Sequence, residues 1–406
     1  MLKAPRGTRD IFGNELFLWS KIENIIREIF YKFNFIEIKT PMFENTELFL
    51  RSVGNTSDII QKELYSFLDK SGRNISLKPE GTAGVIRASI ENNLFLNFNK
   101  LFYFTSCFRY ERPQSGRYRE FYQTGAEFFC DNNYLNDLEI ILLAHEILSK
   151  TGLKNIELKI NSLGCKNCRK KYDNELKNFL DKNIFRLCDD CNIRFNKNNL
   201  RILDCKNKNC QEIISEAPKI LDFLCDDCKS NFDLVIKKIN KYKIKYEIDK
   251  SLVRGLDYYT QIVFEFIYND RAICGGGRYD NLIKELGGPD IQGVGFAFGF
   301  ERLLDAIKSI NYLSFENNID FYIATISNQE FEFAQEIAFN LRNKNFLVDY
   351  NLRKKNLKSQ IKFANSISAQ YLIVLGDQER KTRLVKVKNM ATRDEKEMDI
   401  NDIEFF

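Results

Sequence analysis

Residues 108–127 read FRYERPQSGRYREFYQTGAE, and this stretch decides which fold the chain adopts. A loop containing Pro, Gln, Ser and Gly separates two segments rich in aromatic residues, which predicts a β-hairpin. Side chains alternate between the two faces of a strand. Arg109 and Glu111 are therefore expected to share one face of the first strand with Cys107. Phe108 and Tyr110 are expected to point the other way.

The second strand of this hairpin carries an unusual set of side chains on one face. Alternation brings together Arg119, Phe121, Gln123, Gly125 and Glu127. A core strand would carry aliphatic side chains at these positions, and a solvent-facing strand would not need the glycine. The face combines cations, a flat aromatic ring, an amide and a carboxylate, which indicates a ligand-binding surface.

A second arginine-bearing segment lies far along the chain, where residues 295–303 read GFAFGFERL. Arginine suits phosphate binding because its guanidinium group is always charged and can bind two oxygen atoms at once. The two segments have the form of two ATP-binding elements on one antiparallel sheet.

The bulk composition is that of an ordinary globular protein. The chain has 406 residues, of which 29% are charged and 44% hydrophobic, and its net charge is +5. This length allows two or three domains with their own cores. The apolar runs are too short to span a bilayer and no secretory signal opens the chain, so a cytoplasmic protein is expected. The small net charge means that a nucleic-acid partner would have to bind local basic patches.

The chain contains a single histidine, His145, within an apolar-periodic segment that predicts a helix. We expect it to be a packed helix residue. Without further histidines, Ser-His-Asp triads and histidine-rich metal sites are hard to build. The chemistry must therefore depend on Arg, Glu, Gln and Tyr side chains, on metal ions and on the substrates themselves.

The two arginine segments resemble the second and third signature motifs of class II aminoacyl-tRNA synthetases. Within that class, three further segments are similar to the histidyl-tRNA synthetase family, namely residues 79–82 (PEGT), 252–259 (LVRGLDYY) and 274–280 (CGGGRYD). The resemblance runs nearly end to end, from residues 5–10 (PRGTRD) to residues 386–390 (KVKNM). One motif alone would be weak, but five motifs in order at the family's spacing are specific.

The resemblance implies an α+β class II synthetase catalytic domain, in which helices flank an antiparallel sheet. We expect this domain in two parts, residues 1–160 and 251–308, interrupted by a cysteine-rich insertion domain at residues 161–250. Residues 308–318 are polar and are expected to form a linker.

The last stretch, residues 319–406, alternates short apolar strands with amphipathic helices. The strands are expected at residues 321–325, 346–350 and 371–375, and the helices at residues 329–342 and 357–367. This alternation predicts a small α/β domain with a largely parallel sheet. The resemblance implies that it is the anticodon-binding domain, with a tRNA as partner.

The beginning of the chain bears on oligomeric state. Residues 14–33 predict an amphipathic helix, and residues 35–38 alternate as a strand that stops at Thr40-Pro41. These elements resemble the first class II motif, which forms a dimer interface in the family, so a homodimer is expected. The simpler alternative is a helix packed on a sheet.

Amino-acid activation displaces pyrophosphate from ATP, and the carboxylate of the amino acid is the nucleophile. The enzyme therefore has to align the substrates and neutralise charge. The resemblance implies that Arg109 binds the α-phosphate and the carboxylate, that Glu111 meets the adenine amino group and that Phe121 stacks on adenine. Arg117 and Arg302 would hold the outer phosphates, with Mg²⁺ as a cofactor. The alternative for each arginine is a solvated surface cation.

Arg254 lies in the VRGLDYY segment, which resembles only the histidine enzymes. In the family this arginine lies against the reacting carboxylate and the α-phosphate. The resemblance therefore implies that Arg254 and Arg109 are the catalytic residues. The alternative is an exposed strand arginine beside a turn glycine.

Recognition of histidine needs an acceptor for the imidazole N–H group and an anionic or amide group for the α-ammonium. The resemblance implies that Glu127 and Tyr259 contact the ring. The residues expected to bind histidine are Glu80, Gly81, Thr82, Arg109, Gln123, Glu127, Arg254, Tyr258 and Tyr259. Glu127 is alternatively a strand carboxylate paired with a cross-strand cation.

Two other details concern the same motifs. Gly275, Gly276 and Gly277 either form a tight connection between strands or let the backbone approach a ligand. Tyr110 and Tyr122 stand where the family often has histidine, and both are expected on the side opposite the ligand.

The insertion carries eight of the 11 cysteines. Six of them form the Cys-x-x-Cys pairs Cys165/Cys168, Cys188/Cys191 and Cys225/Cys228, and Cys205 and Cys210 lie between the last two pairs. The three pairs predict structural zinc, because disulfides are unfavourable in a reducing cytosol and the flanking residues are polar. One or two tetrahedral sites are possible. Cys107, Cys130 and Cys274 lie on predicted strands and are expected to be core or pocket residues.

The resemblance implies a histidine–tRNA ligase that activates L-histidine with ATP and transfers it to the 3′ adenosine of its tRNA. The main alternative is an inactive paralogue, such as the regulatory partner of ATP phosphoribosyltransferase, which shares this fold. A class II synthetase for another amino acid and a non-enzymatic tRNA-binding module are further alternatives. The three motif arginines Arg109, Arg254 and Arg302 speak against the inactive paralogue and the binding module.

Overall fold

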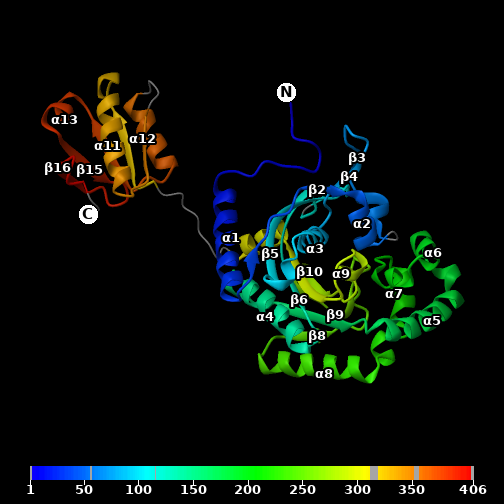
Figure 1. The fold of residues 1–406 in the computed structure, drawn as a ribbon. Helices are drawn as coiled ribbons and strands as arrows, with labels where there is room; N and C mark the ends of the chain where they lie inside the picture. The colour runs from blue at the N-terminus through cyan, green and yellow to red at the C-terminus, as the bar shows by residue number, and fades with distance from the viewer. Residues whose placement is uncertain (1, 55–56, 115, 311–318, 352–355, 404–406) are drawn as a thin grey trace. The chain divides into compact units, whose positions relative to one another are not determined.

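The structure is a computed structural model that describes residues 2–54, 57–114, 116–310, 319–351 and 356–403. The chain divides into two compact units, Met1–Leu313 and Ser314–Phe406 (Figure 1). Each unit has its own hydrophobic core. Residues 311–318, most of the predicted linker, lie outside the described residues.

An eight-stranded sheet forms the centre of the larger unit. Its strands lie in the order β1 (Ile36–Glu37), β5 (Lys100–Phe108), β6 (Glu120–Cys130), β11 (Gln292–Gly299), β10 (Arg271–Arg278), β9 (Thr260–Tyr268), β7 (Glu157–Ser162) and β8 (Tyr246–Ile248). Neighbouring strands are antiparallel, except for the parallel pairs β1–β5 and β7–β8 at the two edges. The predicted antiparallel sheet is confirmed.

Helices pack on this sheet because their apolar residues recur on one face. In α1 (Asn14–Lys32), Ile22, Ile26 and Phe30 are four residues apart and fully buried. Phe30 stacks on Phe102 of β5, with the ring centroids 4.4 Å apart. Two more helices, α4 (Tyr134–Lys150) and α10 (Phe300–Ser309), also contact the sheet. The helix predicted at residues 14–33 is therefore confirmed.

The pairing of β6 with β11 joins the two arginine-bearing segments, which are far apart in sequence. Glu127 lies opposite Gly295, and Gln123 lies opposite Gly299. A Cβ atom on Gly295 would come within 2.2 Å of Glu127 Oε2, so only glycine fits beside this carboxylate. The sheet register therefore places Arg302, at the start of α10, beside the hairpin.

A smaller sheet and several helices surround the same region. They are β2 (Phe43–Asn45), β4 (Asn74–Leu77) and β3 (Ser66–Leu68) in that order, with α2 (Thr46–Val53), a π-helix at Ile59–Glu63, α3 (Thr82–Glu91) and α9 (Leu282–Glu285). The small sheet is antiparallel.

The cysteine-rich insertion is helical. Its helices are α5 (Lys166–Lys182), α6 (Asp189–Phe195), α7 (Lys208–Ser215) and α8 (Asp226–Lys241), drawn in green in Figure 1. Buried side chains of α5, α7 and the intervening turns form a separate core. However, α8 packs against α4, and β8 pairs with β7 in the large sheet. The end of the expected insertion (161–250) therefore contributes to the catalytic sheet, because Tyr246–Ile248 complete its edge.

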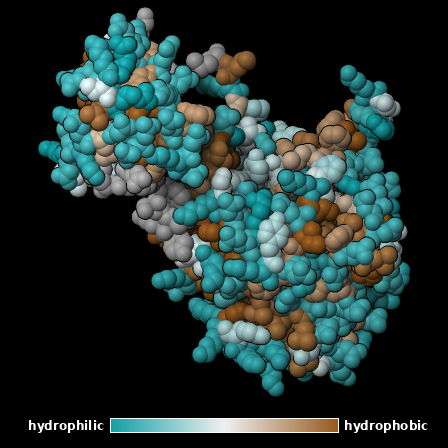
Figure 2. Space-filling model, turned by 60° about the vertical axis from the view of Figure 1, so that its left-hand side comes forward, coloured by the Kyte–Doolittle hydropathy of each residue, from teal (hydrophilic) through white to brown (hydrophobic). Residues whose placement is uncertain are grey.

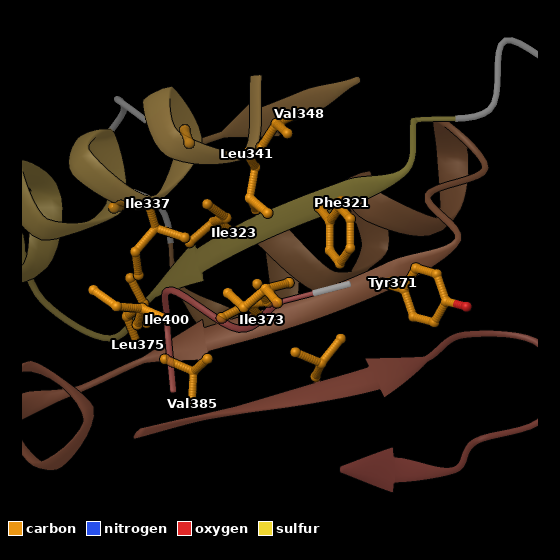
Figure 3. Packing of buried hydrophobic residues seen from close by; sticks show 14 of the residues in the cluster. Phe321, Ile323, Ile337, Leu341, Val348, Tyr371, Ile373, Leu375, Val385 and Ile400 are labelled. Carbon is orange, nitrogen blue, oxygen red and sulfur yellow. The ribbon is translucent and has the colours of Figure 1, made fainter. Parts of the chain in front are cut away.

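The smaller unit has a five-stranded sheet in the order β13-β12-β14-β15-β16. Its elements are β12 (Phe321–Thr325), α11 (Phe331–Asn343), β13 (Val348–Tyr350), α12 (Leu357–Ser366), β14 (Tyr371–Leu375), α13 (Asp377–Thr382), β15 (Leu384–Asn389) and β16 (Glu395–Asp399). The first three strands are parallel, as predicted, and the last two are antiparallel. Figure 3 shows Ile337 and Leu341 of α11 directed at the sheet, where Ile323 and Ile373 lie.

Among the described residues, no helix is both long and apolar enough to cross a membrane.

Candidate active site

A cavity lies where the hairpin meets β9, β10 and β11, and the start of α3 and the segment 254–259 complete its wall. The wall includes the predicted residues Glu80, Thr82, Arg109, Glu111, Arg117, Phe121, Gln123, Glu127, Arg254, Tyr258, Tyr259 and Arg302. The fold thus brings together residues from four separate stretches of sequence.

Gly81 is the one predicted substrate-binding residue that is not part of this wall. A Cβ atom at this position would come within 2.3 Å of the Tyr103 ring. Gly81 therefore lets the turn before α3 pack closely on Tyr103. The structure gives it a packing role rather than a direct place in the cavity.

The carboxylate of Glu127 is surrounded by hydroxyl groups. Glu127 is buried, and its carboxylate accepts hydrogen bonds from Tyr279 Oη at 2.6 Å and Thr82 Oγ1 at 2.7 Å. Tyr103 Oη lies 3.4 Å away. Burial raises the pKa of Glu127 to about 8. A cationic or N–H-bearing ligand would favour the ionised form, because it supplies the opposite charge that the buried carboxylate lacks.

Glu80 is also buried, but its carboxylate meets backbone groups. It accepts the N–H groups of Thr82 at 2.7 Å and Ala83 at 2.8 Å, in the first turn of α3. Burial raises the pKa of Glu80. Glu80 therefore caps α3 and faces the cavity at once, so the helix fixes its position.

Arg109 and Phe121 form a stacked pair across the hairpin. The guanidinium carbon of Arg109 lies 5.2 Å from the centre of the Phe121 ring, and its Nε atom donates to Pro79 O at 2.9 Å. Glu111 lies between two cations, 4.0 Å from Arg109 and 3.7 Å from Arg117. Both arginines keep N–H groups that a phosphate can reach.

The guanidinium group of Arg254 packs against Gly275 of β10. A Cβ atom on Gly275 would come within 2.2 Å of the Arg254 guanidinium group. This explains the first glycine of the triple-glycine stretch, which lies inside β10 and not in a connection between strands. Arg254 pairs with Glu265 of β9. Its Nε atom is buried and has no hydrogen-bond partner among the described residues, so one N–H group is left for a ligand.

Arg302 also lines the cavity. Its Nη1 atom donates to Ala272 O at 3.1 Å. Burial and the neighbouring cation Arg117 lower its pKa. Two cations held this close favour an anionic ligand between them, because the ligand relieves their repulsion. This is the electrostatic setting that a polyphosphate needs.

Tyr258 and Tyr259 close the cavity near Glu127. Both are buried, and their ring centroids are 4.6 Å apart. Gln123 accepts a hydrogen bond from Cys107 Sγ at 3.3 Å. Cys107 therefore lies on the same side of the hairpin as Gln123, whereas β5 ends at Phe108 and strand alternation does not extend to Arg109 and Glu111.

Sequence reasoning missed several members of the wall. Tyr279 donates to Glu127, and Glu265 pairs with Arg254, yet neither was predicted. Tyr279 lies in the CGGGRYD motif that contains the triple glycine, so motif context was an available signal for it. Their partners lie 152 and 11 residues away, which no local pattern reveals.

The outer face of the hairpin shows one confirmed and one wrong expectation. Tyr110 and Tyr122 lie outside the cavity wall, as predicted, and Tyr122 packs edge-on against Trp19 with centroids 4.8 Å apart. Arg119 was expected beside Phe121, but its guanidinium carbon lies 3.9 Å from the Tyr110 ring centre. The reason is that β6 begins only at Glu120, so strand alternation does not extend to Arg119.

His145 lies in α4, with its ring centroid 6.1 Å from that of Phe266, and it is not part of the cavity wall. Burial lowers its pKa. This confirms the expected packed helix residue. Cys107 and Cys274 are buried on β5 and β10, and Cys130 ends β6.

The cysteines of the insertion form two groups, which we call cluster A and cluster B. Cluster A contains Cys165, Cys168, Cys225 and Cys228, and cluster B contains Cys188, Cys191, Cys205 and Cys210. In each cluster the four sulfur atoms lie within 4.8 Å of one another, so each could hold a metal ion. The first and third Cys-x-x-Cys pairs thus belong together. The prediction omitted Cys205 and Cys210 because they do not have this spacing.

The antiparallel sheet with its paired arginine segments defines an aminoacyl-tRNA synthetase of class II. The crystal structure of the apo histidyl-tRNA synthetase of S. aureus superimposes with a TM-score of 0.83 at 35% identity, over 99% of this chain and 98% of that one. A sequence profile described as histidyl-tRNA synthetase matches residues 7–303, and one described as an anticodon binding domain matches residues 320–405. The chain belongs to the histidyl-tRNA synthetase family.

Curated relatives extend over the same length. The histidine–tRNA ligase of Thermoanaerobacter sp. (strain X514) is 47% identical over 411 residues, covering 100% of this chain and 98% of that protein. The histidine–tRNA ligase of Clostridioides difficile (strain 630) is 45% identical over 97% of this chain and 96% of that protein.

Proposed function

We propose that the chain activates L-histidine with ATP to histidyl-adenylate and transfers the histidyl group to the 3′ adenosine of its tRNA. One observation carries this proposal. A single cavity holds both the phosphate-binding set, Arg109, Arg117 and Arg302, and the buried acceptor Glu127. The full-length relatives named histidine–tRNA ligase support the same activity.

In this proposal Glu127 accepts the imidazole N–H group, with Tyr259 alongside. Glu80, Thr82 and Gln123 face the α-ammonium end, and Tyr258 closes that side. A buried carboxylate left without its partner is costly, which favours histidine over amino acids that cannot supply an N–H group.

At the ATP end, Phe121 stacks on adenine and Glu111 accepts from its amino group. Arg117 and Arg302 bind the outer phosphates. Their guanidinium groups neutralise the charge that develops on pyrophosphate as it leaves.

The reacting atoms meet between Arg109 and Arg254. The histidine carboxylate attacks the α-phosphorus of ATP, the bond to pyrophosphate breaks, and no protein nucleophile is needed. Arg254 is the catalytic residue with a free N–H group, because Glu265 occupies only one side of its guanidinium. It holds the two anionic reactants together and offsets their repulsion.

Class II synthetases use ATP with Mg²⁺. This ion takes oxygen ligands from carboxylates and substrate phosphates, and Glu265 supplies a carboxylate to the cavity wall. When bound, the ion neutralises charge on the phosphates. For clusters A and B, four thiolates per group favour Zn²⁺.

The partners follow from the two units. The smaller unit, which the anticodon-binding profile matches, would hold the tRNA.

We also propose a homodimer in the cytoplasm. Figure 2 shows hydrophobic patches on the larger unit, and Phe17 and Tyr31 of α1 and Ile36, Met42 and Phe43 nearby in sequence are exposed. Exposed apolar residues on adjoining segments fit a subunit interface.

The regulatory-paralogue alternative is not favoured, because Arg109, Arg254 and Arg302 all line the cavity and the second unit is present. The deciding experiment is ATP–pyrophosphate exchange with each of the twenty amino acids. We expect exchange with histidine alone, followed by charging of its tRNA. Exchange with another amino acid, or with none, would overturn the proposal.

A further inference from the structure

The insertion contains more cysteine chemistry than the activation reaction uses. All eight cysteines of clusters A and B are free. The Sγ atoms of Cys165 and Cys168 are 3.6 Å apart, and those of Cys188 and Cys205 are 3.8 Å apart. Tetrahedral zinc with Zn–S bonds of about 2.3 Å requires sulfur–sulfur distances of about 3.8 Å. Each cluster therefore has the dimensions of a single four-thiolate ion site.

The backbone N–H groups around the sulfur atoms also support a metal site in each cluster. Cys225 N–H donates to Cys168 Sγ at 3.1 Å, and Cys188 N–H donates to Cys210 Sγ at 3.2 Å. Such N–H donors stabilise thiolates bound to a metal. Each Cys-x-x-Cys pair also begins immediately before a helix, at α5, α6 and α8.

Both clusters are connected to the segment 257–259 of the active site. Beyond cluster B, Arg201 Nε and Asn198 Nδ2 donate to the same Asp257 oxygen, at 3.0 and 2.9 Å. Beside cluster A, Arg169 follows Cys168 in α5 and its Nη1 atom donates to Tyr259 O at 3.0 Å. Residues next to cluster B thus contact Asp257 at the start of this segment, and Arg169 next to cluster A contacts Tyr259 at its end.

A second contact from cluster B reaches the cavity from another direction. Arg194, three residues after Cys191, donates to Asp58 Oδ2 at 2.8 Å. Asp58 precedes the π-helix that begins at Ile59, and Ile59 lines the cavity.

We propose that clusters A and B each bind one Zn²⁺ ion and that the two ions position residues 257–259 for histidine binding. Between Cys188 and Cys210 the chain has the seven-residue helix α6, a six-residue 3-10 helix at Asn199–Asp204 and the start of α7, and Leu200 and Ile202 are buried in the core of the insertion. Cys191 and Cys205 lie on either side of Asn198 and Arg201, so metal ligation at both cysteines would add to this packing in fixing where Asn198 and Arg201 point. The positioning role rests on the proposed histidine activation, whereas the zinc content does not.

The zinc content is tested by elemental analysis of the purified full-length chain. We expect two zinc ions per chain. The double variant Cys165→Ser/Cys225→Ser should lose one ion, and Cys191→Ser/Cys205→Ser should lose one ion. Metal-free wild-type protein, or a cluster B variant that keeps two ions, would overturn the assignment.

The positioning role is tested with variants that keep every cysteine. Arg201→Ala and Asp257→Asn each remove the charge-assisted contact and should raise the histidine KM about tenfold. The ATP KM and the zinc content should not change. Arg186→Ala is the matched control, because Arg186 is an exposed arginine of the same insertion that donates to Asn183 Oδ1, and it should leave all values unchanged.

A wild-type histidine KM in both Arg201→Ala and Asp257→Asn would refute the positioning role, even if zinc is present. Failure of the proposed function looks different, because wild-type enzyme would then show no histidine-dependent exchange while the zinc count stayed the same.

Discussion

Arg254 shows how closely a single residue depends on its neighbours in space. Its guanidinium lies over Gly275, its partner is Glu265 on β9, and its Nε atom is left for a ligand. Each neighbour comes from a different strand or loop. The arginine is oriented before substrate arrives, which lowers the cost of binding the two reactants together.

We expect Arg254→Ala to slow adenylate formation by a hundredfold or more, or about 3 kcal/mol. Histidine binding should weaken far less, because Glu127 and the tyrosines remain. Single-turnover activation kinetics measure the effect. Arg254→Lys keeps the charge but not the two-pronged geometry and should fall between wild type and Arg254→Ala. A rate within about threefold of wild type in Arg254→Ala would remove its catalytic assignment.

Glu127 makes a prediction about stability. Its folded pKa is about 8, above the ordinary value of 4.5, because of burial. Between these values the folded state binds more protons than the unfolded state, so the contribution of Glu127 to stability falls as pH rises from about 5 to 8. Glu127→Gln lacks this titration. The variant should therefore gain stability relative to wild type as pH rises through this range, as measured by urea unfolding without ligands. A constant difference from pH 5 to 8 would contradict the shifted pKa.

Among the elements, β10 serves two purposes. Its Gly275 makes room for Arg254 on one side, and at its end Arg278 is fully buried. Arg278 Nε donates to Asp137 Oδ1 of α4 at 2.9 Å, and Nη1 donates to Gln292 Oε1 at 3.1 Å. The arginine of the CGGGRYD motif therefore fastens the strand to the helix behind the sheet and does not face the substrate.

We expect Arg278→Ala to destabilise the larger unit by about 3–5 kcal/mol, because it leaves the buried carboxylate of Asp137 without its cation. Arg271→Ala is the matched control, since Arg271 is exposed on the same strand and its loss should cost little. Denaturant unfolding of both variants tests this. Equal stability of the two would show that the buried pair contributes no more than a surface charge.

At the scale of the whole molecule, the chain consists of two units with separate cores. Every residue of the cavity wall belongs to the unit Met1–Leu313. The smaller unit has a core of its own, which includes Phe321, Ile373 and Ile400 (Figure 3). Activation and tRNA binding are thus assigned to different parts of the chain.

A chain that ends at Leu313 should therefore keep histidine-dependent ATP–pyrophosphate exchange within about tenfold of the full chain, since its core is independent. Aminoacylation of tRNA should fall by at least about a hundredfold, because the anticodon-binding unit is missing. Comparing the two assays on one preparation separates the steps. If both activities fell equally while the truncated protein stayed folded, the assignment of activation and tRNA binding to separate units would be wrong.

Local patterns were sufficient for much of this molecule. The period of apolar residues predicted α1 and the strands β12 and β14, because those elements bury one face or a short apolar run. The motifs that contain Glu80, Arg109, Arg254 and Arg302, read through their resemblance to the family, predicted 12 residues of the cavity wall. Such patterns work where the residues that define a role lie close together in sequence.

Only the tertiary structure decided the rest, because it depends on contacts between distant residues. Sequence spacing could not pair Cys165 with Cys225 or add Cys205 and Cys210 to cluster B. It could not show that Gly275 makes room for an arginine, or that Tyr279 donates to Glu127 across 152 residues. The chain by itself determined which chemical groups were available and on which strands they lie. Sheet register and packing determined which of those groups meet, since these follow from the burial of many side chains at once.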